Sequence, residues 1–326
     1  MAKISVIIPA YNRAHCIARA IQSVLAQTLP VTEIIVVDDG STDGTAELAQ
    51  SHFGSTIRVL RHPTNLGAAA ARNTGMSAVS VDCDYIAWLD SDDEWLPEKL
   101  EKQVAVLNAS PSVVAVCSAY KMIENRQESN YIPDDRSPWA EGLLLGCDVG
   151  PGATLLVRRE AALATGLLDT RLTRYEDWDW LLRLAQKFEM TLISTPLAKV
   201  HRGGWPRPEI VETAIEQFIR KHQADFDALG QQRSRRALSR MWLDGAWFAY
   251  NMHPRNCSLE RFYFWKALRI SFIQPPGVYL GFLDSLLGTR WSLRLHFAAQ
   301  FSHMVRLKLR GRRLIHLREG SNERRG

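Results

Sequence analysis

The sequence has 326 residues, of which 46% are hydrophobic and 23% charged, and these proportions are ordinary for a folded soluble protein. The length allows one large domain, or one domain with a substantial extension. The five cysteines are odd in number and form no C-x-x-C pair, which excludes a disulfide framework and a thiolate zinc site and favours a reducing compartment.

The net charge of +5 hides an asymmetry along the chain. Residues 1–205 hold 19 Lys and Arg against 25 Asp and Glu, a net charge of −6, whereas residues 206–326 hold 21 against 10, a net charge of +11. Gly and Pro cluster at 203–209, which is typical of a boundary. We therefore expect two regions, 1–205 and 206–326, with different partners.

Strands and helices are predicted to alternate over the first ninety residues, which is the pattern of a parallel sheet with crossover helices and places the chain in the α/β class. In such a sheet, ligands bind beyond the carboxyl ends of the strands. Short apolar and β-branched runs predict strands at 4–11, 33–39, 56–62 and 85–90, and apolar residues at helical spacing predict helices at 13–28 and 45–53.

Each predicted strand is followed by polar or sharply turning residues: PAYNR, DDGSTDGT, NLGAAAARNTG and DSDDEW in chain order. All four turns should gather at one edge of the sheet. The first turn has no G-x-G-x-x-G, and G-x-x-x-x-G-K-[ST] is absent from the sequence, so NAD and P-loop chemistry are disfavoured.

The fourth turn crowds Asp90, Asp92, Asp93 and Glu94 behind an apolar run. Carboxylates this close raise one another's pKa and destabilise the fold unless a cation lies among them. A solvated turn with incidental acids is the alternative interpretation.

Five blocks, SVIIPAYNR, EIIVVDDGSTDGT, NLGAAAARNTG, WLDSDDEWLPEKL and YEDWDWLLRL, resemble in this order and spacing the nucleotide-sugar glycosyltransferases of family 2. The resemblance covers about residues 3–202. It implies a GT-A (Rossmann-like), mostly parallel sheet flanked by helices as a catalytic domain at 1–205, followed by a mostly helical basic region at 206–326. The implied reaction is inverting, metal-dependent transfer of one sugar from a nucleotide-diphosphate sugar.

The resemblance also implies a nucleotide site. Asp38 or Asp39 would accept a hydrogen bond from the base, since a uracil or thymine ring offers an N–H donor. Arg72 would reach the base or the phosphates; the alternatives are a solvated Arg72 and a second turn that merely caps a helix through Asp43 or Thr45. The implied nucleotide-binding residues are Pro9, Ala10, Tyr11, Asn12, Asp38, Asp39, Gly67, Arg72, Asp90 and Ser91.

The acidic turn resembles the family's D-x-D motif, which implies that Asp90 and Asp92 hold Mg²⁺ or Mn²⁺ together with the diphosphate. His201 lies where related enzymes place a group near the metal, although a lone His is more often structural.

Glu176 and Asp177 resemble the family's E-D motif. Asp177 would be the general base for the acceptor hydroxyl, and its acidic neighbour and partial burial should raise its pKa. The alternative interpretation of these acids is a helix N-terminus, and Asp169 is interpreted as either a structural cap or a contact.

Apolar residues recur at helical spacing in 209–230 and 231–252, and aromatics mix with arginines in 261–270 and 290–313. Residues 290–326 hold ten Lys and Arg against two acids. An anionic membrane surface is the partner that this composition favours, with packing on the catalytic domain as the alternative and nucleic acid not expected.

No signal peptide and no bilayer-spanning segment is predicted, so we expect a cytoplasmic protein at the inner face of the plasma membrane. Q-x-x-R-W, which processive relatives carry, is absent, which indicates single-sugar addition to a glycan or lipid-linked glycan in bacterial surface polysaccharide assembly. UDP is the expected leaving group, with GDP and dTDP left open. A sugar-nucleotide pyrophosphorylase is one alternative, but the sequence lacks the Gly-rich loop with Arg and Lys that such an enzyme uses to bind a triphosphate. A nucleotide-sugar sensor or membrane adaptor without catalysis is the other alternative.

Overall fold

The computed structural model describes residues 2–124, 127–201, 208–251, 256–271, 278–279 and 282. The chain divides into two compact units, Met1–Ala237 and Leu238–Gly326. The first unit therefore extends past residue 205. The boundary near 203–209, which was drawn from composition, stays a prediction, and residues 202–207 lie outside the described residues.

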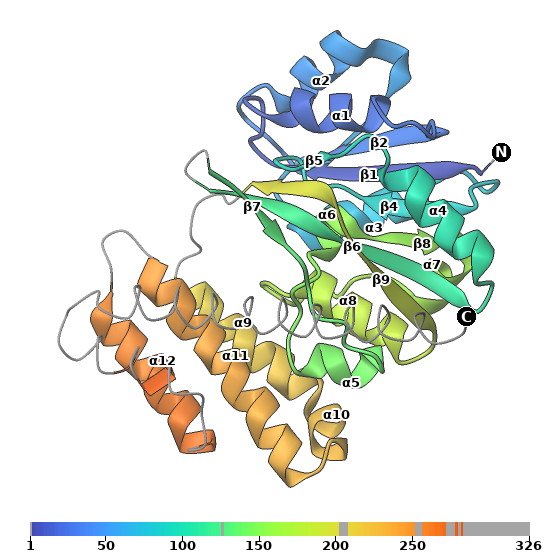
Figure 1. Cartoon of the computed structure of the whole chain (residues 1–326). Coiled ribbons are helices and arrows are strands. Elements are labelled where there is room, and N and C mark those ends of the chain that lie inside the picture. The colour runs from blue at the N-terminus through green and yellow to red at the C-terminus, as the bar shows by residue number, and fades with distance from the viewer. Residues whose placement is uncertain are drawn as a thin grey trace, which may run out of the picture. The chain divides into compact units, whose positions relative to one another are not determined.

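A nine-stranded mixed sheet forms the centre of the first unit (Figure 1). Its order is β3-β2-β1-β4-β8-β6-β9-β5, and β7 pairs with β6. The half formed by β3, β2, β1 and β4 is parallel throughout, as the alternation of strands and helices predicts, whereas β8 runs antiparallel to both of its neighbours. The strands are β1 Ile4–Ala10, β2 Glu33–Asp38, β3 Arg58–Arg61, β4 Tyr85–Trp88, β5 Glu94–Trp95, β6 Val113–Glu124, β7 Gln127–Tyr131, β8 Leu156–Arg158 and β9 Glu189–His201.

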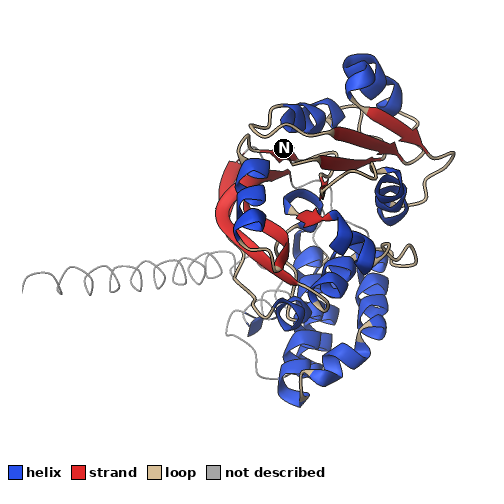
Figure 2. Ribbon diagram, turned by 90° about the vertical axis from the view of Figure 1, so that its right-hand side faces the viewer, coloured by secondary structure: helices blue, strands red, loops and turns tan. Residues whose placement is uncertain are grey.

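Helices cover both faces of the curled sheet (Figure 2). Strand residues alternate sides, so β1 and β2 bury side chains toward α1, α2 and α4 on one face and toward α3 on the other. The helices of this unit are α1 Ile17–Leu25, α2 Thr45–Phe53, α3 Ala68–Ala78, α4 Lys99–Ala109, α5 Trp139–Leu144, α6 Pro151–Thr154, α7 Arg159–Thr165, α8 Glu176–Ala185, α9 Pro208–Lys221 and α10 Gln223–Ala228, with one 3₁₀ turn at Gly54–Thr56.

Helix α3 packs closely against β1. A Cβ atom on Gly75 would lie 2.3 Å from Cγ2 of Ile7, so only glycine permits this approach. The close packing fixes α3, and with it Arg72, over the carboxyl end of the parallel strands.

The region predicted as helical at 209–230 is two helices, α9 and α10, separated at His222. Helix α11, Gln231–Asn251, crosses from the first unit into the second, and α12, Cys257–Ile270, belongs to the second. Within the second unit, the ring of Trp242 stacks on Tyr263, with 6.1 Å between ring centroids. None of the helices in the described ranges has the length and apolar character of a membrane span. The basic segment 290–326 lies outside the described residues.

Candidate active site

The turns after β1 and β2 are joined by hydrogen bonds. The Asn12 backbone N–H donates to Oγ of Ser41 (2.8 Å), and the Asn12 side chain accepts from the Thr42 N–H (3.0 Å). Asn12 has a φ of +53°, a left-handed conformation that asparagine tolerates better than most residues. Asp43 accepts the backbone N–H groups of Ala14 and Thr45, so it braces the start of α2, in line with the capping alternative. Two predicted turns therefore lie together at one edge.

The two carboxylates at the end of β2 differ in their surroundings. Asp39 accepts the backbone N–H groups of Leu66 (2.9 Å) and Gly67 (2.7 Å) and bonds to Nδ1 of His62 (2.7 Å). Asp38 is fully buried; within the described residues, its oxygens have no hydrogen-bond partner, and one lies 3.2 Å from Nε of Arg61. A buried carboxylate that accepts no hydrogen bond is costly, and an N–H donor would relieve that cost. Oδ2 of Asp39 also retains acceptor capacity, because it accepts a single bond.

A pocket of about 450 Å³ opens beside these carboxylates. Arg61 and His62, which contact Asp38 and Asp39 respectively, are part of its wall. Of the residues predicted to line a base pocket, Pro9 and Ala10 end the buried strand β1, and Tyr11 is 43% exposed. The pocket is lined by Gly40, Ser41, Thr42, Arg61, His62 and Pro63.

Gly67 begins α3 with a φ of +93°. A Cβ atom at position 67 would meet no protein atom within 4 Å, and the role of Gly67 in nucleotide binding stays a prediction. The positive φ is the physical reason for glycine at this position, because it orients the N–H toward Asp39.

The acidic turn after β4 is held by cations from the first helix region. Nη2 of Arg13 lies 3.4 Å from Oδ2 of Asp92, and Nη2 of Arg19 donates to the backbone oxygen of Asp92 (2.6 Å). Burial and the neighbouring Asp90 raise the pKa of Asp92. Ser91, between these acids, is buried. The turn therefore holds neighbouring carboxylates that raise one another's pKa, as the sequence predicted.

His201 ends β9 next to this turn. Its backbone N–H donates to Oδ1 of Asp93 (2.8 Å), and its Nε2 lies 2.7 Å from Oε1 of Glu94. Burial, with the charges of Asp90 and Asp92, raises the pKa of Asp93 well above its usual range. The structure brings His201 to the acidic turn, bonded to Glu94.

Arg72 joins two predicted parts of the site. It is only 4% exposed and donates from Nη2 to Asp90 (2.6 Å) and from Nη1 to Glu176 (2.8 Å). Burial opposes its charge, but the carboxylates of Asp90 and Glu176 outweigh it and raise the pKa of Arg72. The solvated alternative for Arg72 is therefore wrong: its guanidinium is buried between Asp90 and Glu176, and Glu176 lies 104 positions from Arg72 in the sequence.

Gly152 shapes the same network. A Cβ atom at this position would lie 2.2 Å from Oδ2 of Asp90, and the Asp90 N–H donates to the Gly152 carbonyl (2.8 Å). A side chain at position 152 would displace the Asp90 carboxylate from Arg72. The sequence held no signal for this role, because glycine spacing alone does not reveal what packs against it.

Asp177 lies in the first turn of α8, half-buried, and accepts the backbone N–H of Trp178 (2.8 Å). Burial and the adjoining Glu176 raise the pKa of Asp177 to about 6, although Arg72 opposes the rise. A carboxylate with this pKa is largely ionised near neutral pH yet basic enough to accept a proton. Glu176 and Asp177 thus lie in the first turn of α8, as the helix N-terminus interpretation predicts, and the assignment of Asp177 as the general base stays a prediction.

The donor set at the acidic turn fits a hard divalent ion. Within the described residues, no cluster of three or more His, Cys, Asp and Glu is arranged around a metal position. Mg²⁺ in proteins commonly takes one or two carboxylates and completes its shell with substrate phosphates and water. Asp92, with its raised pKa, and Asp90 supply two carboxylates of this kind. The guanidinium of Arg13, a residue that the sequence analysis did not identify, lies 3.4 Å from the Asp92 carboxylate.

The pattern that defines glycosyl transferase family 2 matches residues 5–145, which include the turns after β1 to β4. Residues 5–145 are thus similar to a glycosyl transferase family 2 domain. It is 31% identical over 191 residues to an uncharacterized glycosyltransferase of Haemophilus influenzae, covering 58% of this chain and 64% of that protein. It is 34% identical over 147 residues to an Escherichia coli UDP-Glc:alpha-D-GlcNAc-diphosphoundecaprenol beta-1,3-glucosyltransferase, WfgD, covering 45% and 57%. The chain thus spans less than two thirds of either curated relative.

The fold of the chain is also similar to that of a solved structure. The crystal structure of S. aureus TarS 1-349 in complex with UDP-GlcNAc superimposes with a TM-score of 0.59 at 17% identity, over 87% of this chain and 89% of that one. This likeness confirms the GT-A fold expected from the sequence.

Proposed function

We propose that this chain transfers one sugar from a nucleoside-diphosphate sugar to an acceptor hydroxyl, with inversion at the anomeric carbon. The observation that carries the proposal is Asp177, a half-buried carboxylate with a pKa of about 6, at the end of the Asp90–Arg72–Glu176 network. Asp177 takes the proton of the acceptor hydroxyl while the oxygen of that hydroxyl forms a bond to the anomeric carbon. The bond from that carbon to the diphosphate breaks, and the nucleoside diphosphate leaves.

The donor would bind across the carboxyl ends of β1, β2 and β4. A base N–H would donate to Asp38 or Asp39, both of which have acceptor capacity. Asp90 and Asp92 would hold Mg²⁺ or Mn²⁺ with the diphosphate, and the ion would neutralise the charge of the leaving group. Arg72 would hold the Asp90 carboxylate in place rather than bind the phosphates, because both of its Nη atoms already donate to carboxylates.

A lipid-linked glycan acceptor at the inner face of the membrane is the substrate that we propose. The name of the Escherichia coli relative specifies a diphosphoundecaprenol-linked acceptor. In the second unit, the ring of Trp265 is 51% exposed and Arg269 lies over it, 5.1 Å from the ring centroid. An aromatic ring paired with a cation suits the interface of an anionic membrane. UDP is the proposed leaving group, with GDP and dTDP as the alternatives that the experiment below distinguishes.

The first experiment is a thermal-shift panel of UDP, GDP and dTDP, each with and without Mn²⁺. A ligand at about a hundred times its Kd stabilises the fold by roughly 2.7 kcal/mol, which is measurable. We expect a shift for one nucleotide that depends on Mn²⁺ and vanishes in Asp92→Ala. The Asp38→Asn and Asp39→Asn variants identify the base acceptor, because only the correct one should weaken uridine as well as UDP.

The mechanism is tested by Asp177→Asn, with Asp82→Asn, an exposed acid far along the chain, as the matched control. Asp177→Asn should retain the nucleotide shift and lose transfer by a factor of about 100 to 10,000, the range for a general base. Transfer that survives this change refutes the assigned base. Nucleotide binding without transfer in the wild type, for every sugar and acceptor tried, would favour the sensor or adaptor instead.

A further inference from the structure

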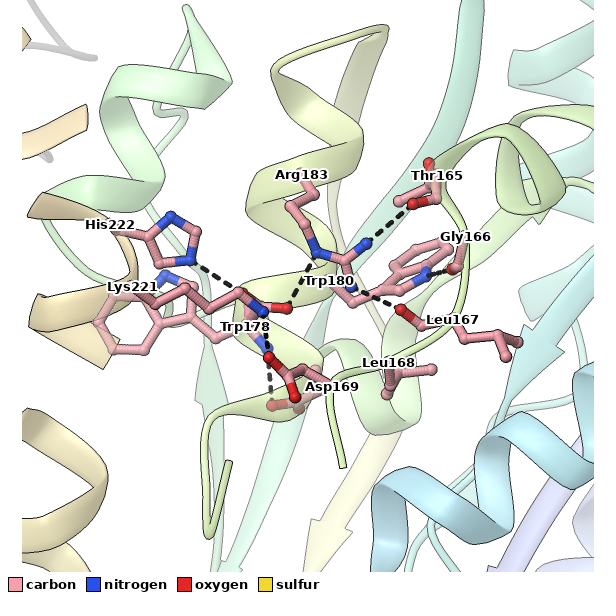
Figure 3. A network of polar contacts seen from close by, with 12 residues as sticks. Thr165, Gly166, Leu167, Leu168, Asp169, Trp178, Trp180, Arg183, Lys221 and His222 are labelled. Carbon is pink, nitrogen blue, oxygen red and sulfur yellow. Dashed lines mark hydrogen bonds and ion pairs between the residues drawn. The ribbon is translucent and has the colours of Figure 1, made fainter. Parts of the chain in front are cut away.

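The first turn of α8 is held on two sides. On one side, Glu176 bonds to Arg72, next to the proposed base Asp177. On the other side, Asp179 is fully buried and points toward α9 and α10. Figure 3 shows Lys221, the last residue of α9, and the adjoining His222 beside this turn.

Asp179 receives three cationic or hydrogen-bonding groups. Nζ of Lys221 lies 2.7 Å from its Oδ1, Nε2 of His222 lies 2.9 Å from the same oxygen, and Nε of Arg183 donates to Oδ2 (3.0 Å). Burial opposes the charge of Asp179, but His222, Lys221 and Arg183 together outweigh it and lower its pKa. Asp179 is therefore an ionised anchor whose partners come mainly from another segment of the chain.

Lys221 is shared between two acids. Its Nζ also lies 2.8 Å from Oδ2 of Asp169, in the turn that follows α7. Arg183 donates to the carbonyls of Thr165 (2.8 Å) and Leu167 (2.9 Å), so it binds the same turn (Figure 3). One ammonium group thus joins the 165–169 turn, α8 and α9. Of the two alternatives for Asp169, the structure supports the structural one.

Aromatic packing adds a second, independent attachment. Phe218 of α9 is fully buried and lies 4.6 Å from the ring of Trp178 and 6.2 Å from that of Tyr175, measured between centroids. Tyr175, which precedes α8, has a φ of +63°. The indole of Trp178 is also held by a hydrogen bond, because its Nε1–H donates to the Leu143 carbonyl (2.9 Å). The backbone on both sides of Asp177 is therefore packed against α9.

We propose that Lys221 and His222, outside the segment that matches the family pattern, are positioning residues that set the place and burial of Asp177 through Asp179. The proposal rests on the proposed function of Asp177 as the base. The titratable or charged residues that face Asp177 are Glu176, Arg72, Asp90 and Cys147; those that face His222 are Asp179 and Asp225. Without its anchor, the first turn of α8 loosens, and water reaches Asp177.

The test compares Lys221→Met, which removes the shared ammonium, with Arg171→Gln. Arg171 binds Asp169 from the solvent side and is 86% exposed. Among the described residues it forms no hydrogen bond or ion pair with α8 and interacts with Asp179 only through its charge, so it is the matched control within the same network. We expect kcat to fall about tenfold to a hundredfold in Lys221→Met, as displacement of a reacting group by about 1 Å can produce. The donor KM and nucleotide Kd should change less than about twofold, because the donor residues lie on other elements. Lys221→Arg should restore most of the lost kcat.

The pKa of Asp177 is a readout that a general loss of stability would not change. It is measured by carboxyl ¹³C NMR, and the resonance of Asp177 is assigned with the Asp177→Asn variant. Hydration should lower this pKa in Lys221→Met and leave it unchanged in Arg171→Gln; the acidic limb of kcat/KM should move to lower pH with it. Unchanged kcat and unchanged Asp177 pKa in Lys221→Met would overturn the proposal. If the wild type transfers no sugar but the pKa of Asp177 moves only in Lys221→Met, the positioning inference stands and the proposed function falls.

Discussion

Replacement of the proposed base should stabilise the protein while it abolishes transfer. In the folded protein, burial and Glu176 raise the pKa of Asp177 from an ordinary 3.8 to about 6. Such a rise corresponds to about 3 kcal/mol in favour of the protonated form. The folded state therefore binds this proton more tightly than the unfolded state, and stability is lost as the pH rises from about 4 to about 6. Above that range, the ionised carboxylate destabilises the fold by up to about 3 kcal/mol.

Asp177→Asn removes the charge and keeps an oxygen that accepts the Trp178 N–H. At pH 8, the variant should unfold at a higher temperature by up to roughly 6 to 12 °C, given the size of the first unit, and at pH 4 the two proteins should unfold together. Differential scanning calorimetry at both pH values measures this difference. The kcat/KM of the wild type should rise with pH through about 6, because only the ionised Asp177 accepts a proton.

Asp169→Asn provides the opposite case, on the side of α8 where Lys221 binds. Arg171 and Lys221 hold the pKa of Asp169 well below its usual range, so its charge stabilises the fold above the ordinary Asp pKa and that stability is lost as the pH falls. Asp169→Asn should therefore lower the unfolding temperature at pH 8. A variant Asp177→Asn that is no more stable than the wild type at pH 8, or that keeps its advantage at pH 4, would refute the electrostatic reasoning.

Two further changes test the network around Arg72, and a third tests the start of α3. Arg72→Met leaves Asp90 and Glu176 uncompensated and should lower the free energy of unfolding by about 3 to 5 kcal/mol, measured by urea denaturation. Gly152→Ala forces the Asp90 carboxylate away from the buried Arg72, so it should lower the unfolding temperature, and isothermal titration should show weaker binding of the metal–nucleoside diphosphate. Gly67→Ala meets no clash yet must adopt a φ of +93°, so it should destabilise the fold by about 1 kcal/mol or more, and an unchanged urea midpoint would contradict this.

Local periodicity was sufficient for the parallel half of the sheet. The apolar runs that end at Ala10, Asp38 and Trp88 alternate with helices, and this alternation places their carboxyl ends at one edge whatever the rest of the chain does. The elements of the second half carry weaker signals, because β8 has three residues and β5 has two. Their pairing depends on long-range contacts that no short window contains.

The sequence by itself determined which side chains follow the parallel strands, and hence that carboxylates gather at one edge, because strand order and chirality leave little choice of where those turns lie. The tertiary structure alone decided how these groups are used. Arg72 is buried between Asp90 and Glu176, Gly152 leaves room for one of those carboxylates, and Lys221 joins Asp169 to Asp179. Each of these contacts joins residues that are far apart in the chain, and charge pairing across such separations depends on the packing of whole elements, which local sequence does not encode.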